Sequence, residues 1–147
     1  MSWFVGKTVL VPIDFSPQSH EAVDTALELA PPGATIHTIH IAPDLMVMEP
    51  GVVWEQTTNE SREKQLVGAF DKEFADSKYD QVHFKVEFGD AGHGIVDYAN
   101  QIGADMIVMP SHGRTGFAHL FMGSVAERVV RLAQCPVLVL KQKKEAS

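Results

Sequence analysis

The sequence is poor in cysteine and in long apolar runs. Cys135 is the only cysteine among the 147 residues, so no disulfide can form within the chain, and a reducing cell interior is the expected setting. No run of apolar residues reaches the roughly 18 that a membrane-spanning helix needs, and the first residues lack the apolar core of a signal peptide. We therefore expect a cytoplasmic protein without membrane insertion.

Basic residues are also scarce. The chain has 12 Lys and Arg against 19 Asp and Glu, a formal net charge of -7. Non-specific affinity for nucleic acid comes mainly from clustered Lys and Arg, and the only such cluster is the final KQKKEAS. We expect residues 142–147 to fray in solvent and the protein to bind no nucleic acid.

Motifs of common catalytic and metal sites are missing as well. The chain has no GxxxxGK[ST] loop, no GxSxG elbow, no HExxH pair and no Cys/His finger. His37 and His40 lie three residues apart in a strand-like segment, so they point to opposite faces and cannot share an ion. We expect no metal-ligand set and no catalytic residue, with slow turnover at most.

Apolar runs and helical stripes alternate along the chain. The composition, 45% hydrophobic and 21% charged, is that of a globular chain, and its length suits one domain over residues 1–147. Ser16 is the predicted N-cap of the first helix, with Pro17 at its first position. The strand-like segments are 7–14, 34–42, 81–89, 105–110 and 135–141, and the helical segments between them are 17–30, 61–77, 94–104 and 124–134.

This alternation predicts an α/β fold: a single doubly wound, five-stranded parallel sheet of the Rossmann-like kind, with helices on both faces. Ligands of such sheets bind beyond the carboxyl ends of the strands, where the strand order reverses. Asp14, the segment after Ile41 and the loop after 105–110 fall at those ends. The connection 43–58 is long and apolar, and we expect it to act as a lid or to pack against a partner subunit.

The loop into the last helix, MPSHGRTGFAHLFMGSVAER, has the features of a phosphate cradle. A glycine-containing loop that enters a helix gathers backbone N–H groups around one small space, and the helix N-terminus adds positive potential. Gly113 and Gly123 allow close approach of the backbone, Ser124 offers a hydroxyl, and Arg114 can bind two anionic oxygens at once.

Two parts of the expected site, Ser124 and Asp14, also have a purely structural interpretation. Ser124 and Glu127 match S-x-x-E, a capping box in which both side chains only satisfy N–H groups of the helix itself. For Asp14, at the end of the first strand, the structural alternative is a cap on the first turn of the next helix.

The segment SHGRTGFAHLFMGSVAERVVRLAQCPVLVLK, preceded by GADMIVMP and combined with VLVPIDFS near the start, resembles the universal stress protein family over nearly the whole chain. Nucleotide-binding members carry Gly, two residues, Gly, nine residues, Gly, then Ser or Thr. Here Gly113, Gly123 and Ser124 match, whereas Pro110 stands at the first glycine. Proline has no N–H and fixes φ near -65°, so it would crowd the nucleotide or remove one contact.

The resemblance implies the ATP-binding subgroup of the family, with ATP, ADP or AMP as ligand and Mg²⁺ as its companion. Asp14 would contact the ribose or adenine end, Pro12 and Ile41 would line the base pocket, and Val125 would supply a further cradle N–H. The full set of implied binding residues is Pro12, Asp14, Ile41, Met109, Pro110, Gly113, Arg114, Gly123, Ser124 and Val125.

The resemblance also implies a role and an assembly. The expected function is a nucleotide-dependent stress-response or signalling module that acts on a client protein. The alternatives are a dimeric stress protein that binds no nucleotide and acts through protein contacts, or a very slow ATPase or autophosphorylating protein. The apolar terminal strand invites pairing, and we expect a homodimer through it, with Val137 and Val139 near the two-fold axis.

Overall fold

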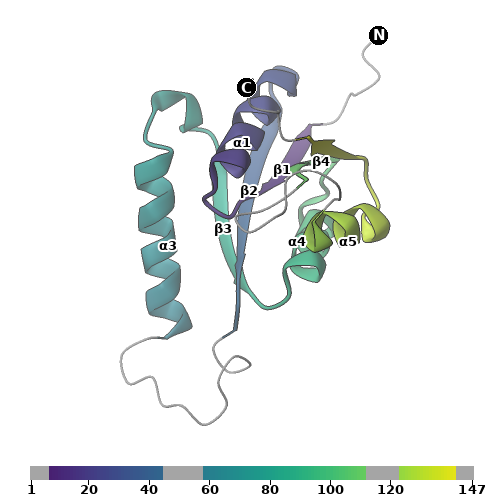
Figure 1. Ribbon diagram of the computed structural model, residues 1–147. Helices are drawn as coiled ribbons and strands as arrows, with labels where there is room; N and C mark the ends of the chain where they lie inside the picture. Colours follow the sequence, from purple (N-terminus) through teal and green to yellow (C-terminus); the bar gives the residue numbers. More distant parts are fainter. Residues whose placement is uncertain (1–6, 45–57, 112–122, 142–147) are drawn as a thin grey trace, which may run out of the picture.

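The computed structural model describes residues 7–44, 58–111 and 123–141 (Figure 1). All the predicted strands and helices form, with ends shifted by a few residues. The strands are β1 (Thr8–Pro12), β2 (Thr35–Ala42), β3 (His83–Phe88), β4 (Met106–Pro110) and β5 (Val137–Leu140). The helices are α1 (Pro17–Leu29), α3 (Asn59–Glu73), α4 (Ala91–Ile102) and α5 (Ser124–Leu132), and the 3-10 turn η1 (Ser77–Tyr79) precedes β3.

The strands form one parallel five-stranded sheet in the order β3-β2-β1-β4-β5. The chain builds outward from β1 to β3 and then returns to the other side of β1, so the strand order reverses between β1 and β4. The predicted doubly wound α/β fold is confirmed. The reversal fixes where a ligand site is expected, at the carboxyl ends of β1 and β4.

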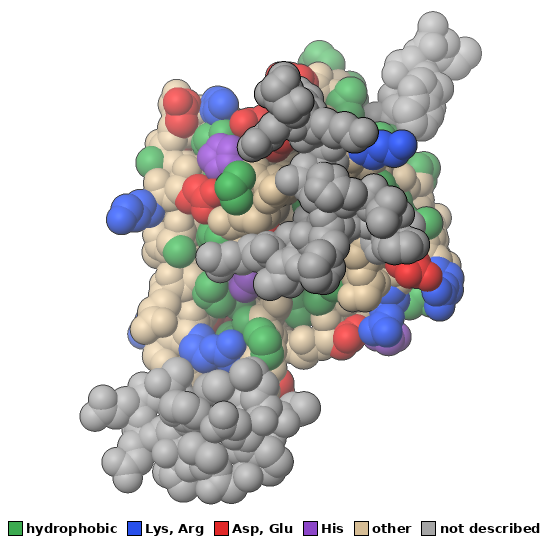
Figure 2. Space-filling model, viewed as in Figure 1, with side chains coloured by type: hydrophobic (Ala, Val, Ile, Leu, Met, Phe, Trp, Pro, Cys, Tyr) green, Lys and Arg blue, Asp and Glu red, His purple; other side chains and the backbone are tan. Residues whose placement is uncertain are grey.

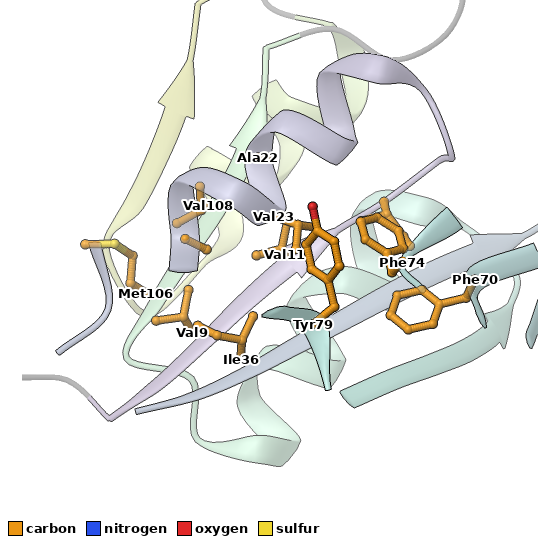
Figure 3. Packing of buried hydrophobic residues seen from close by; sticks show 12 residues of the cluster. Val9, Val11, Ala22, Val23, Ile36, Phe70, Phe74, Tyr79, Met106 and Val108 are labelled. Carbon is orange, nitrogen blue, oxygen red and sulfur yellow. The ribbon is translucent and has the colours of Figure 1, made fainter. Parts of the chain in front are cut away.

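Two apolar layers cover the two faces of the sheet. Alternate side chains of each strand point to opposite faces, so Val9 and Val11 pack under α1 and α3, whereas Leu10 packs under α4 and α5. Figure 3 shows the first layer, where the rings of Phe74 and Tyr79 lie edge to face with 4.9 Å between their centroids. In Figure 1, α3 lies next to β3 and α4 lies next to α5, so each face has its own helix pair.

Side-chain caps begin most of the described helices. The predicted N-cap is confirmed: Ser16 Oγ accepts from the backbone N–H of Ser19 at 3.1 Å, and Pro17 is the first helical residue. Thr58 caps α3 with a reciprocal bond to Ser61, Asp76 caps η1, and Asp90 caps α4. Each cap satisfies an N–H group that has no partner within its own helix.

The charge of the described surface is mixed. In the face drawn in Figure 2, acidic and basic side chains are interspersed over the described residues. Over the same residues, no helix combines the length and the apolar character needed to cross a membrane.

Candidate functional site

The carboxyl ends of β1, β2 and β4 meet at one edge of the sheet. Pro12 pairs with Ile39, and Leu10 pairs with Ile107. Asp14 follows the end of β1 by two residues, and Ser111 directly follows β4. The structure therefore puts the strand ends that carry Asp14, Ile41 and Pro110 at one edge of the sheet.

Asp14 takes part in the turn that leads from β1 into α1. Its carboxylate Oδ1 accepts from the backbone N–H of Ser16 at 3.0 Å, and its own N–H donates to Ser19 Oγ at 3.3 Å. The cap of the helix, however, is Ser16. Asp14 thus braces the turn with one carboxylate oxygen but does not begin the helix, so the structural alternative holds only in part.

Pro12, Ile41 and Met109 lie near the carboxyl ends of three neighbouring strands, β1, β2 and β4. Pro12 is buried, and Met109 is only 4% exposed. Ile41 belongs to the layer under α4 and α5 and lies against Gly94: a Cβ on that glycine would come within 2.8 Å of Ile41 Cδ1. The close approach of α4 at Gly94 restricts the Ile41 side chain at this edge of the sheet.

Pro110 is the last residue of β4, and its nitrogen, which carries no hydrogen, faces β1. Ile107 and Ser111 both donate their N–H groups to the β5 side, to Pro136 at 3.0 Å and to Leu140 at 3.0 Å. Neighbouring residues of a strand direct these groups to opposite sides, so the nitrogen of Pro110 faces β1. The pairing of β1 with β4 ends at Leu10, two residues earlier than its pairing with β2. Pro110 therefore lies where the pairing of β1 with β4 has already ended, at the point where the strand order reverses.

Helix α5 begins without a side-chain cap. Its N-cap is Gly123, and no cap hydrogen bond from a side chain is found among the described residues. The predicted alternative of a Ser124–Glu127 capping box is wrong, because Ser124 is the first helical residue and therefore lies one position too late to cap. The first N–H groups of the helix have no acceptor within it, and Ser124 and Val125 are exposed there.

Gly123 closes the base of the loop that precedes α5. Its N–H donates to the carbonyl oxygen of Ser111 at 2.7 Å, so the two ends of 112–122 are joined by a backbone hydrogen bond. That donor is therefore already used. Gly123 has a φ of -62°, which any residue can adopt, so its backbone conformation does not require glycine.

Several predicted residues lie outside the described part of the chain. Gly113 and Arg114, the middle of the expected cradle, are among them, as are most of the predicted lid 43–58 and the tail 142–147.

The start of α4 holds a charged cluster that sequence reasoning missed. Asp90 Oδ2 accepts from the backbone N–H of His93 at 3.0 Å and contacts its Nδ1 at 2.8 Å, while Arg128 of α5 donates to Asp90 Oδ1 at 3.2 Å. These hydrogen bonds from His93, followed by the charge of Arg128, lower the pKa of Asp90 to about 2. An Asp before the apolar stripe of 94–104 was the available signal.

The prediction that His37 and His40 point to opposite faces of the sheet is confirmed by the contacts of the two rings. His37 stacks on His83 and lies near Tyr98 of α4, whereas His40 lies against Phe15 on the α1 side. Among residues 7–44, 58–111 and 123–141, no group of three or more potential metal ligands gathers.

A comparison with known families gives a match over most of the chain. The model of the universal stress protein family matches residues 6–141. The chain belongs to the universal stress protein family. Among curated members, the universal stress protein MJ0531 of Methanocaldococcus jannaschii is 32% identical over 144 residues, covering 95% of this chain and 84% of its own length. The universal stress protein YxiE of Bacillus subtilis is 30% identical, covering 90% and 97%.

Solved structures of universal stress proteins share the fold. Protein MJ0577 of Methanocaldococcus jannaschii superposes with a TM-score of 0.74 at 26% identity, covering 95% of this chain and 98% of its own. A universal stress protein in complex with cAMP has a TM-score of 0.64 at 21% identity, covering 92% and 96%. One from Archaeoglobus fulgidus in complex with dAMP has a TM-score of 0.63 at 19% identity, covering 94% and 99%.

Proposed function

We propose that this universal stress protein binds an adenine nucleotide, with ATP as the first candidate, at the carboxyl edge between β1 and β4. Occupancy of this site would make it a nucleotide-dependent stress-response or signalling module. The observation that carries the proposal is the start of α5, where no side-chain cap is found among the described residues, at the carboxyl edge where β1 and β4 are neighbours. The cAMP and dAMP complexes of proteins with the same fold support the choice of an adenine nucleotide.

The phosphates of the nucleotide would lie at the start of α5. The N–H groups of Ser124 and Val125 have no acceptor within the helix, and the helix dipole favours negative charge at this point. The Ser124 hydroxyl would add a donor. Gly113 and Arg114, which precede them in the loop, are proposed to complete the cradle.

The sugar and base would lie at the ends of β1 and β2. A carboxylate accepts hydrogen bonds from sugar hydroxyls but repels phosphate, so Asp14 is suited to the ribose end of the ligand. Ile41 and Pro12 would contact the base, with Met109 below them. This arrangement separates the fixed negative charge from the phosphate donors.

Pro110 remains compatible with this site. The sequence motif suggested that proline removes a contact with the ligand, but its nitrogen faces β1, within the plane of the sheet. We therefore propose that the chain is an ATP-binding member in which proline replaces the first motif glycine. Mg²⁺ would enter with the nucleotide and reduce the repulsion between its phosphates and a protein of net charge -7.

Titration with nucleotides tests the proposal. ATP, ADP and AMP, each with and without Mg²⁺, are added during thermal unfolding and in calorimetry. Ligand at 100 times its dissociation constant should stabilise the folded protein by about 2.7 kcal/mol. Asp14→Asn, which keeps the shape of the side chain, should weaken binding. If no adenine nucleotide binds the wild type, the alternative of a dimeric stress protein acting through protein contacts is favoured.

We also propose a homodimer through β5. Within the described residues β5 pairs only with β4, and all four of its residues are half-buried, so one edge is open for pairing. Val137 and Val139 would lie near the two-fold axis. Light scattering at micromolar concentration should give twice the monomer mass, and Val139→Lys should give the monomer. A monomeric wild type would exclude this assembly.

A further inference from the structure

The side chain of His40, on β2, reaches across to the end of β1. Its Nδ1 lies 2.8 Å from the carbonyl oxygen of Ile13. A carbonyl oxygen can only accept, so Nδ1 carries the proton and donates it. His40 points to the α1 side of the sheet, opposite to its neighbour Ile41, and so it does not line the base pocket itself.

This hydrogen bond replaces a rung of the sheet. The N–H of Ile13 donates to the carbonyl oxygen of Ile39 at 2.8 Å, which is the last regular rung between β1 and β2. In an unbroken parallel ladder, the Ile13 oxygen would then accept from the N–H of Ile41. Here it accepts from the imidazole of His40. The ladder ends at this residue, and the chain turns away toward α1.

The same ring also supports the residue on the other side of Asp14. Phe15 has a φ of 63°, a left-handed conformation that is unfavourable for a residue with a Cβ. Its ring lies 5.2 Å from the His40 ring, centroid to centroid, and 6.2 Å from that of Phe84. These contacts retain a backbone conformation that Phe15 would not adopt alone.

His40 therefore contacts both sequence neighbours of Asp14: it donates a hydrogen bond to Ile13, and its ring packs against that of Phe15. We propose that His40 is a positioning residue of the nucleotide site, which fixes the direction of the Asp14 carboxylate toward the sugar hydroxyls of the ligand. This inference rests on the proposed nucleotide binding and adds the residue that determines how the sugar is recognised.

Two variants of His40 separate the hydrogen bond from the general packing. His40→Asn places its amide nitrogen close to the position of Nδ1 and keeps the donor, whereas His40→Leu removes it. The control is Thr38→Val. Thr38 lies on the same strand and the same face, and its hydroxyl also donates to a backbone carbonyl, that of His83 at 2.7 Å, but it lies away from the strand ends.

The measurement is the ratio of affinities for ATP and 2′,3′-dideoxy-ATP, determined by calorimetry on folded protein. The wild type should prefer ATP, and Asp14→Ala, which removes the acceptor, should lose the preference. His40→Leu should lose most of it, with ATP affinity about tenfold lower, the effect of one hydrogen bond that is no longer well placed. His40→Asn should keep most of the preference, and Thr38→Val all of it.

The outcomes distinguish the two proposals. A wild-type preference retained in His40→Leu, or an equal loss in Thr38→Val, would overturn the positioning role. A wild type that binds neither ligand would overturn the proposed function instead. In that case the backbone chemical shifts of Asp14 and Phe15 decide: they should change in His40→Leu and not in Thr38→Val, and unchanged shifts would overturn the positioning role as well.

Discussion

Helices α4 and α5 begin at the same edge of the sheet but in opposite ways. Asp90 caps α4 with a carboxylate, which also contacts His93 and Arg128. Helix α5 begins at Gly123, without a side-chain cap among the described residues. A cap stabilises a helix by satisfying its first N–H groups, and it also occupies the place where an anion would bind. Under the proposed function, Asp90 occupies the start of α4, whereas the start of α5 is left for the phosphates of the nucleotide.

The largest effect is expected from placing a negative charge at the start of α5. Ser124→Glu should weaken ATP binding by about 5- to 1,000-fold, because charges about 4 Å apart repel by on the order of 1 to 4 kcal/mol. The same charge should raise the free energy of unfolding by about 0.3 to 1 kcal/mol through the helix dipole. Calorimetry and urea unfolding measure the two effects.

Ser124→Gln is the matched control for this experiment. It has nearly the same size without the charge, so it should lose only the contact of the hydroxyl. Equal weakening by Gln and Glu would show that the phosphates do not lie at this helix end, and the contrast between α4 and α5 would then have no functional meaning.

The second effect concerns the cap of α4. Asp90→Ala should lower the free energy of unfolding by about 1 kcal/mol, because the N–H of His93 loses its acceptor. Asp90→Asn should cost much less, since Asn caps nearly as well as Asp. Urea unfolding of the three proteins measures the difference. If Asn costs as much as Ala, the ion pair with Arg128 would be the stabilising contact, and the cap would not.

A smaller effect is expected from giving α5 the kind of cap that α4 has. Gly123→Asp should raise the free energy of unfolding by a few tenths of a kcal/mol. The backbone of Gly123 allows this, because its φ of -62° does not require glycine. ATP binding should weaken at the same time, as shown by calorimetry. A variant with stronger ATP binding would contradict the idea that open N–H groups form the phosphate site.

The sequence was sufficient to predict the fold and most of the strand ends. Alternating apolar runs located each strand, and Ser16 followed by Pro17 located the start of α1, because those signals are local. The S-x-x-E pattern failed at α5 because a pattern does not show whether its serine precedes the helix or lies within it. The helix begins one residue earlier than the capping box requires, so Ser124 is its first residue and Gly123 is its N-cap.

The role of His40 could not be predicted in the same way. Sequence spacing placed His40 on the face opposite to His37 and excluded a shared ion. Its hydrogen bond, however, joins it to Ile13, which lies 27 positions earlier in the sequence. Only the register of β1 against β2 brings its ring to Ile13. For the same reason, the contact of Arg128 with Asp90 depends on how α4 and α5 pack, which no local pattern specifies.

The smallest effect is a change in stability with pH at the α4 cap. The pKa of Asp90 is about 2 in the folded protein, below its ordinary value of 3.8, so the folded state favours the charged form. The stabilisation is complete above about pH 4 and is lost as the pH falls from about 4 to 2. It should be modest, since the Asp90 side chain is 52% exposed and solvent screens its contacts. The difference in melting temperature between the wild type and Asp90→Asn should therefore shrink over this range, because other titrating groups cancel in the difference. A difference in melting temperature that stayed constant from pH 5 to pH 2 would show that the charge of Asp90 does not stabilise the start of α4. Asp90 would then act only as a hydrogen-bond acceptor, as a neutral side chain does.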